Sequence, residues 1–169
     1  MSIARRSPVV PDPARPGQES VWDYPRPPRL EPVGRRLQVI HGATVVADTT
    51  RGFRVLETSH PPTYYLPPAD CDLAGLLPSP GSSVCEWKGQ ATYFDVTVGA
   101  DTVRRAAWSY PSPLPGFEAI RDHLAFYPSP LRCFVDGERA TPQPGGFYGG
   151  WVTSHVVGPF KGAPGSSHW

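Results

Sequence analysis

The segment from Cys85 to Gly89, which reads Cys-Glu-Trp-Lys-Gly, holds the residue types in this chain best suited to chemistry. Of the 16 basic residues only two are lysines, Lys88 and Lys161, and each follows an aromatic residue and precedes a glycine. Lysine differs from arginine in its compact ammonium, its adjustable pKa and its nucleophilicity, so a lysine kept among arginines is a candidate for a selected role. The alternative is chance combined with codon bias.

Cys85 and Lys88 are three positions apart, a spacing that places side chains on opposite faces of a regular strand. A turn or bulge before Gly89 would instead bring the thiol and the ammonium into one pocket. Because a neighbouring ammonium favours the thiolate form of cysteine, Cys85 is then a candidate nucleophile or redox thiol. The alternative is that Cys85 is a small core residue, since free cysteines are commonly buried.

Lys88 has three candidate roles. It can bind a carboxylate or phosphate group of a ligand, or form a Schiff base if it is removed from water. It can also form a structural ion pair with Glu86 or Asp95. We expect binding of a small polar or anionic ligand, with the ion pair as the competing interpretation.

His60 precedes two prolines, in a rigid segment that can present an imidazole as a general acid or base. A histidine in a surface turn is the alternative. Trp87, Trp108 and Tyr110 can wall a pocket with stacking faces and a hydroxyl, although such tryptophans also fill the cores of sheets. Tyr64 or Tyr65 would contribute to the same pocket. The candidate catalytic residues are therefore Cys85, Lys88 and His60, and the candidate ligand-binding residues are Tyr64, Tyr65, Trp87, Lys88, Trp108 and Tyr110.

The elements that position these residues are predicted to be short strands. The chain of 169 residues is long enough for one domain, and its 23 prolines and 17 glycines disfavour long helices. We expect a mainly β protein that consists of a disordered tail (1–18), an extended aromatic arm (19–36), a β domain (37–138) and an extension rich in glycine, proline and aromatic residues (139–169).

Alternating apolar residues predict the strands within the β domain. A hairpin is expected over 37–48 with Gly42-Ala43 as its turn, and further strands over 53–57, 63–66, 84–88, 91–98 and 101–108. We expect a turn over 78–83, one or two helical turns over 117–124, and pairing of 125–127 with 131–135.

Composition and charge exclude several classes of protein. The net charge of +1 comes from interleaved signs, which disfavours binding to nucleic acid or to an anionic membrane. The three cysteines never form a Cys-x-x-Cys pair, so we expect no zinc site, no other metal and no cofactor. No apolar run has the length of a signal peptide or a membrane helix, so we expect a cytoplasmic protein.

Five segments together give the chain a resemblance to a known family, the domain-of-unknown-function family 427, sometimes labelled nucleotidyltransferase-like. They are Val46 to Arg51, Glu57 to Tyr65, Cys85 to Val96, Ala106 to Pro115 and Ala125 to Tyr127, and the resemblance covers about residues 37 to 138. Members of the family typically read Cys-Pro-aromatic-Lys-Gly, and this chain has Glu86 where they have proline.

The resemblance implies a β-tent fold, similar to Mss4-type and methionine-sulfoxide-reductase-type domains, in which short antiparallel strands form two sheets over a pocket. Many β-tents hold a structural zinc in paired Cys-x-x-Cys knuckles, which this chain lacks. The nucleotidyltransferase label finds no chemical support. Metal-dependent nucleotidyl transfer needs clustered carboxylates after a Gly-Ser pair, and here Asp70 and Asp72 precede Gly81-Ser82.

Two functions of different classes follow from the sequence. The first is a β-tent protein that binds a small polar or anionic ligand between aromatic residues and Lys88, with or without chemistry at Cys85. The second is an interaction module without enzymatic activity, including a homodimer, that uses the aromatic arm around Trp22 and the extension around Trp151.

Overall fold

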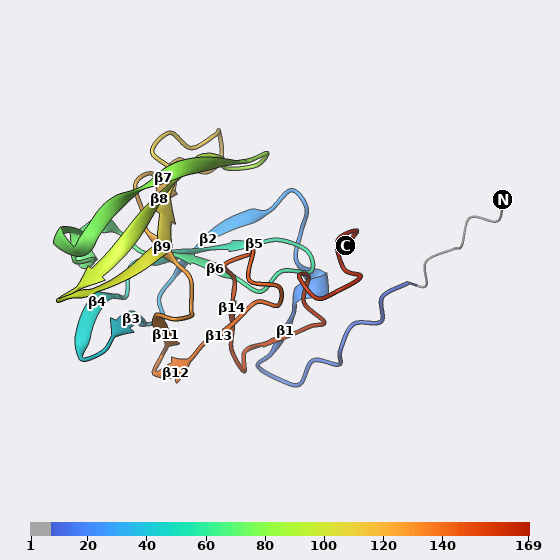
Figure 1. Ribbon diagram of the computed structural model, residues 1–169. Coiled ribbons are helices and arrows are strands. Elements are labelled where there is room, and N and C mark those ends of the chain that lie inside the picture. Colours follow the sequence, from blue (N-terminus) through green and yellow to red (C-terminus); the bar gives the residue numbers. More distant parts are fainter. Residues whose placement is uncertain (1–7) are drawn as a thin grey trace.

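A computed structural model describes residues 8–169 of the chain (Figure 1). The first seven residues of the predicted tail lie outside the described part. Residues 8–18 run without regular structure and hydrogen-bond to the C-terminal extension, with the Asp12 N–H donating to the Gly158 carbonyl over 2.8 Å and Gln18 Nε2 donating to the Ser154 carbonyl over 2.9 Å. The described part of the predicted tail is therefore tethered to the extension.

The first four-stranded sheet is antiparallel and carries most of the predicted site. Its strands in order are β10 (Ala125–Phe126), β9 (Asp101–Ser109), β8 (Gly89–Val98) and β7 (Leu76–Cys85). The turn predicted over 78–83 is wrong, because this segment lies inside the edge strand β7. The register with β8 shifts between Ser79 and Ser82, so Pro80 and Gly81 bulge out of the ladder. Pro80 has no backbone N–H to donate, and in the bulge none is required.

The second four-stranded sheet confirms the predicted hairpin over 37–48. Its strands in order are β12 (Glu138–Arg139), β11 (Arg132–Val135), β3 (Leu37–His41) and β4 (Thr44–Thr49). The expected pairing of 125–127 with 131–135 is wrong, because β10 pairs with β9 whereas β11 pairs with β3. Cys133 and Val135 of β11 lie opposite Val39 and Leu37, and all four side chains are buried in one core.

A three-stranded sheet and two short pairs complete the fold. The three strands are β2 (Arg29–Val33), β5 (Gly52–Leu56) and β6 (Thr63–Tyr65), and the pairs are β1 (Glu19–Ser20) with β15 (Val156–Val157) and β13 (Thr141–Pro142) with β14 (Trp151–Val152). The range 19–36, which we predicted as an arm, thus contributes a full sheet strand, β2, as well as the docked segment that contains β1.

Within residues 8–169 the helical content consists of single 3-10 turns. They are η1 (Val21–Asp23), η2 (Pro68–Asp70), η3 (Leu73–Gly75) and η4 (Glu118–Ile120). The helical segment predicted over 117–124 shrinks to η4. The prediction of a mainly β protein is confirmed, and the β-tent name, which comes from the resemblance, stays a prediction.

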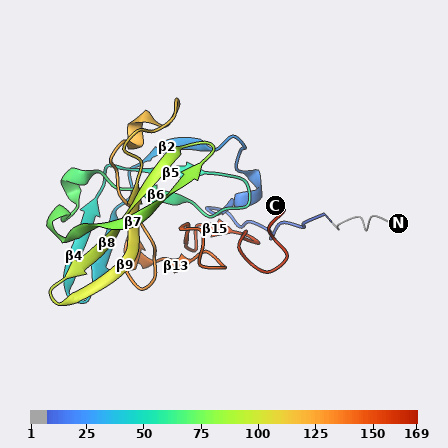
Figure 2. The ribbon, with the colours of Figure 1, turned by 45° about the horizontal axis from the view of Figure 1, so that its top comes forward.

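Strand β6 separates two apolar cores. Tyr64 and Leu66 face the core beneath β3 and β11, whereas Tyr65 faces a second core that contains Trp108 and Tyr110. This alternation follows from the two-residue period of a strand. The sheet of β7, β8 and β9 crosses over β5 and β6 (Figure 2), so that the second core lies between the two sheets.

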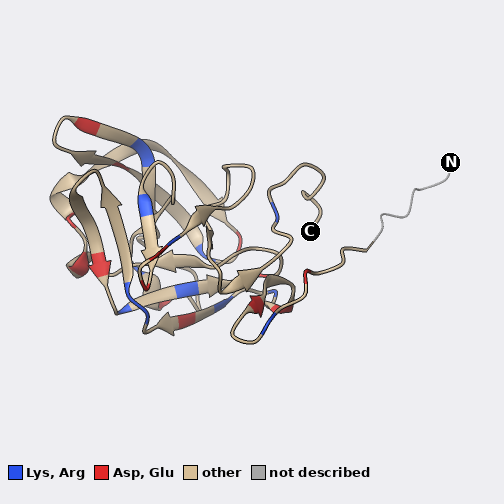
Figure 3. Ribbon diagram, turned by 90° about the horizontal axis from the view of Figure 1, so that it is seen from below, with Lys and Arg blue, Asp and Glu red and all other residues tan. Residues whose placement is uncertain are grey.

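Charged residues of both signs are interleaved around the fold, as Figure 3 shows. None of the helices within residues 8–169 has the length and apolar character needed to cross a membrane.

Candidate functional site

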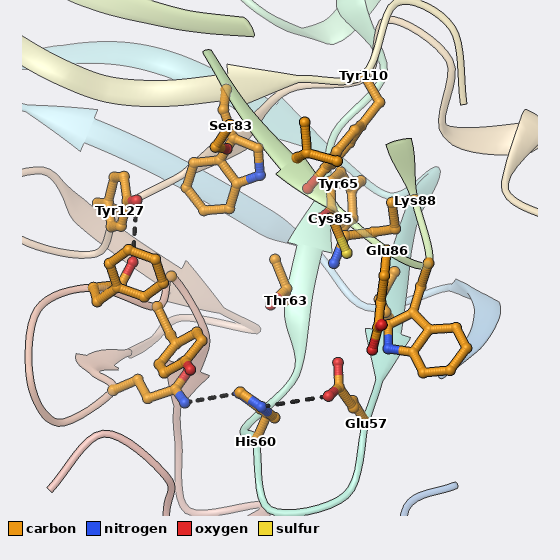
Figure 4. Close-up of a pocket in the computed structure, with 18 of the residues that line it drawn as sticks. Glu57, His60, Thr63, Tyr65, Ser83, Cys85, Glu86, Lys88, Tyr110 and Tyr127 are labelled. Atoms are coloured by element: carbon orange, nitrogen blue, oxygen red, sulfur yellow. Dashed lines mark hydrogen bonds and ion pairs between the residues drawn. The ribbon is translucent and has the colours of Figure 1, made fainter. Parts of the chain in front are cut away.

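A cavity of about 310 Å³ opens where the turn between β7 and β8 meets β5, β6, β9 and the segment 143–161 (Figure 4). We call it the lysine cavity. Its charged and polar lining residues are Glu57, His60, Thr63, Ser83, Cys85, Glu86, Lys88, Gln143 and Lys161, and its aromatic ones are Tyr65, Trp87, Tyr93, Trp108, Tyr110, Tyr127, Phe147 and Tyr148. In Figure 4, Lys88 and Cys85 lie on one side, Tyr127 lies across from them, and His60 and Glu57 form a further edge.

The turn between β7 and β8 places Lys88 at the cavity. Cys85 pairs with Gly89 across the hairpin, which leaves Glu86, Trp87 and Lys88 as its three-residue loop. Gly89 has a φ of +113°, and a Cβ there would lie 3.3 Å from the Ser112 carbonyl oxygen, so this position requires glycine. The Leu114 N–H donates to the Lys88 carbonyl over 2.9 Å and holds the loop.

Cys85 and Lys88 both line the cavity, because the turn cancels the opposite facing that a regular strand would give them. Cys85 is half-buried and also packs against the second core. The other two thiols line no part of the lysine cavity, and burial raises the pKa of Cys71 to about 12 and that of Cys133 further.

The two lysines of the chain meet at this cavity although they lie far apart in sequence, and no arginine within residues 8–169 lines it. Lys88 Nζ lies 5.7 Å from the centre of the Tyr110 ring, and Lys161 Nζ lies 5.7 Å from that of Tyr148. Within residues 8–169 neither lysine forms an ion pair with an aspartate or glutamate. The ion pair weighed for Lys88 with Glu86 or Asp95 is thus not formed, and Lys161 Nζ donates over 3.1 Å to the backbone oxygen of Trp169, the last residue of the sequence.

Trp108 forms a wall of the cavity and also belongs to the second core. Its ring centre lies 4.7 Å from that of Tyr127, and its exposed fraction is 7%. The segment after β13 closes over the indole at Gly149, where a Cβ would lie 2.1 Å from Trp108 Cη2. Trp108 thus serves both interpretations that the sequence left open, as a core residue and as a pocket wall.

The two tyrosines of β6 differ in where they lie. Tyr65 lines the lysine cavity with Tyr110, and its hydroxyl is buried without a hydrogen-bond partner among the described residues. Burial raises the pKa of Tyr65 and that of Tyr110. Tyr64 faces the opposite side of the strand and lines a separate cavity of about 240 Å³ with Glu31 and Arg54, so its predicted place in the same pocket is wrong.

His60 is held by a buried glutamine instead of lying in an open surface turn. Gln143 Nε2 lies 3.0 Å from His60 Nδ1 and 2.9 Å from the Lys161 carbonyl oxygen, while Gln143 Oε1 accepts from the Gly150 N–H over 3.2 Å. Burial lowers the pKa of His60 to about 4, and the cations Lys161, Arg26 and Lys88 act in the same direction against the opposing effect of Glu57. The imidazole is therefore neutral near pH 7.

Glu57 supplies a carboxylate to the same edge of the cavity. Its Oε2 accepts from Arg26 Nη2 over 3.1 Å and lies 3.6 Å from His60 Nε2, whereas no described residue donates to its Oε1. The sequence did not single out Glu57 or Gln143 as site residues. It drew attention to Lys161 only because Lys161 and Lys88 share the local sequence aromatic-Lys-Gly. The signal in the sequence was the three-residue spacing of Glu57 and His60.

The aromatic residues of the alternative function are engaged within the chain. Trp151 is 1% exposed and its Nε1 donates to the Phe126 carbonyl over 2.9 Å. Trp22 Nε1 donates to the Pro159 carbonyl over 2.9 Å, and its ring packs edge-on against Trp169. Both tryptophans therefore pack against other parts of the same chain, and Trp22 remains half-buried.

Within the described part of the chain no three His, Cys, Asp or Glu side chains gather in a way that could hold a metal ion. Comparison with protein families found a match over residues 29–140, to a family described as Domain of unknown function (DUF427). Comparison with curated proteins found no match.

Proposed function

Because the chain belongs to the DUF427 family, whose description assigns no activity, we propose from the lysine cavity itself that the protein binds a small aromatic anion. The observation that carries the proposal is that both lysines of an arginine-rich chain line one aromatic cavity, which no arginine of the described residues lines. Ligand pockets commonly combine apolar walls with a few converging polar groups, and a volume of about 310 Å³ suits a small molecule.

The lysines have the properties that anion binding needs. Both are half-buried, both lie over tyrosine rings, and neither forms an ion pair with an aspartate or glutamate of the described residues, although Lys161 donates to the backbone oxygen of Trp169. A carboxylate in a partly desolvated site accepts charge-assisted hydrogen bonds from an ammonium, which are stronger than neutral ones. The faces of Trp87 and Trp108 offer stacking surfaces for a flat ring.

Chemistry at Cys85 is a secondary part of the proposal. Cys85 is the one thiol of the chain that lines the cavity, and Lys88 lies three positions away in the turn that follows it. A thiol beside an ammonium is a candidate nucleophile for an electrophilic ligand. Binding of the anion does not depend on this step.

The test is a titration with 3-phenylpropionate, which combines one flat ring with one carboxylate. Binding is followed by tryptophan fluorescence, because Trp87 and Trp108 line the cavity. We expect saturable binding, and a loss of about tenfold or more in affinity in Lys88→Ala, since a charge-assisted hydrogen bond is lost. The matched control is Arg104→Ala, which removes an exposed cation of β9 outside the cavity. Absence of saturable binding, or equal affinity in Lys88→Ala and wild type, would refute the proposal.

A further inference from the structure

The lysine cavity holds charges of both signs that do not pair with each other. Glu57 and Glu86 line it together with Lys88 and Lys161, yet no aspartate or glutamate among the described residues lies within ion-pair distance of either ammonium, and Lys161 Nζ donates instead to the backbone oxygen of Trp169. Of these charges the half-buried Lys88 ammonium has no ionic or hydrogen-bonding partner among the described residues, and such a charge in a partly desolvated cavity is costly unless a ligand complements it. The arrangement therefore carries information about the ligand beyond its negative charge.

Glu57 is the carboxylate that is held in place. Its Oε2 lies against Arg26 Nη2 at 3.1 Å and His60 Nε2 at 3.6 Å, and its side chain is 22% exposed. Its Oε1 has no donor within residues 8–169, and Figure 4 shows the carboxylate at the edge of the cavity. Glu86, by contrast, is exposed on the rim of the cavity, where water screens its charge.

The neutral His60 keeps the Glu57 charge available. The Gln143 amide has a fixed orientation, because Oε1 accepts from the Gly150 N–H while Nε2 donates to the Lys161 carbonyl. Its remaining N–H must then donate to His60 Nδ1, which places the imidazole proton on Nε2, facing Glu57. His60 thus turns its Nε2–H toward the carboxylate, with Nε2 3.6 Å from Oε2, and adds no positive charge beside it.

We propose that the ligand of the lysine cavity is an aromatic zwitterion, with its anionic group at Lys88 and Lys161 and an ammonium group at Glu57 Oε1. An aromatic amino acid has this chemistry: a flat ring for the aromatic walls, a carboxylate for the lysines and an ammonium for Glu57. His60 and Gln143 are positioning residues for Glu57. The inference rests on the proposed function, because it adds one group to the aromatic anion proposed above.

The experiment compares three matched probes by calorimetry: phenylalanine, 3-phenylpropionate, which lacks the ammonium, and 2-phenylethylamine, which lacks the carboxylate. We expect phenylalanine to bind about tenfold more tightly than 3-phenylpropionate, because it gains a charge-assisted hydrogen bond. Glu57→Gln should abolish this preference while binding of 3-phenylpropionate persists. Lys88→Ala should weaken the binding of both carboxylate probes and leave the binding of 2-phenylethylamine unchanged.

Arg26→Ala is the matched control for Glu57→Gln. Both variants break the ion pair between Arg26 and Glu57, but only Glu57→Gln removes the carboxylate. We expect Arg26→Ala to keep the preference for phenylalanine or to increase it. Circular dichroism shows whether each variant is folded. If Glu57→Gln is not folded, Glu57→Asp, which keeps the charge and shortens the side chain, is measured in its place.

The outcomes separate the two proposals. If 3-phenylpropionate binds wild type but phenylalanine binds no more tightly, the zwitterion inference is wrong and the proposed function stands. The same conclusion follows if Glu57→Gln leaves the preference unchanged. If neither carboxylate probe binds, the proposed function fails and the inference fails with it.

Discussion

The side-chain amide of Gln143 donates to Nδ1 of His60 over 3.0 Å, and this contact determines which nitrogen of the imidazole carries its proton. The Gln143 side chain is 2% exposed, and its other N–H and its oxygen are engaged by the Lys161 carbonyl and the Gly150 N–H. The sequence predicts His60 as a candidate general acid or base, and this hydrogen bond adds which ring nitrogen carries the proton. The neutral ring presents a single N–H, at Nε2, toward Glu57.

We predict that His60 makes the protein less stable in mild acid. Burial lowers its pKa from 6.5 to about 4, so between these values the unfolded chain binds more protons than the native one. Stability is therefore lost as the pH falls from about 6.5 toward 4, by roughly 3 kcal/mol over the full window. Urea midpoints measured from pH 7.5 to 4.5 in wild type and His60→Gln isolate this contribution. Parallel pH profiles of the two proteins would contradict it.

A second prediction concerns Gly149, which lies against the Trp108 indole. A Cβ at this position would lie 2.1 Å from Cη2, and the ring cannot yield easily because it is packed against Tyr127. We expect Gly149→Ala to lower the free energy of unfolding by about 1–3 kcal/mol through overpacking. The variant should also bind 3-phenylpropionate more weakly, because the Trp108 indole that forms a wall of the cavity moves.

The matched control is Gly34→Ala, since a Cβ at Gly34 meets open space and no positive φ opposes it. Its free energy of unfolding should stay within about 0.5 kcal/mol of wild type in the same urea titration. Equal stabilities of Gly149→Ala and Gly34→Ala would show that the segment moves away from Trp108 at little cost.

The strands that the sequence predicted well are those whose pattern is local. The hairpin of β3 and β4 is visible because apolar residues alternate on both sides of Gly42-Ala43. The path of β7 was missed because Pro78 and Pro80 look like a turn in the sequence, and only the pairing with β8 shows that Pro78 sits in an edge strand and Pro80 in a bulge.

The candidate site follows the same distinction. Cys85, Trp87 and Lys88 could be grouped from sequence because one turn carries all three, and Gly89 marks that turn. Lys161 and Gln143 reach the cavity through long-range packing of the C-terminal extension, which no local pattern encodes. Glu57 comes from the end of β5, and its proximity to the cavity depends on how two sheets cross.

The three thiols should differ in their rates of alkylation in the folded protein. Cys85 lines the cavity and is half-buried, whereas burial raises the pKa of Cys71 to about 12 and raises that of the fully buried Cys133 further. Since the thiolate is the reactive form, iodoacetamide at pH 8 should label Cys85 first, Cys71 slowly and Cys133 only after unfolding.

Peptide mapping by mass spectrometry resolves the three sites. Saturating 3-phenylpropionate should slow labelling of Cys85 and leave the rate at Cys71 unchanged, because only Cys85 lines the lysine cavity. A ligand effect of equal size at both thiols would indicate a global change in stability and count against binding in the cavity.

The final prediction separates a binding lysine from a structural arginine. Lys88 forms no ion pair among the described residues, so Lys88→Ala should change the free energy of unfolding by no more than about 0.5 kcal/mol while the affinity for 3-phenylpropionate falls about tenfold or more. Arg54 of β5 offers the opposite case. Its side chain is 19% exposed, and its Nε donates to Glu31 over 2.6 Å while its Nη1 donates to Glu19 over 2.8 Å.

Arg54→Ala leaves Glu19 and Glu31 without their shared cation, so we expect a loss of about 2 kcal/mol in stability. Affinity for 3-phenylpropionate should stay near that of wild type, because Arg54 does not line the lysine cavity. Urea unfolding and fluorescence titration of the two variants give both quantities. If Lys88→Ala instead destabilises the protein as much as Arg54→Ala, Lys88 stabilises the fold, and the reason for placing two lysines at one cavity must be sought in folding.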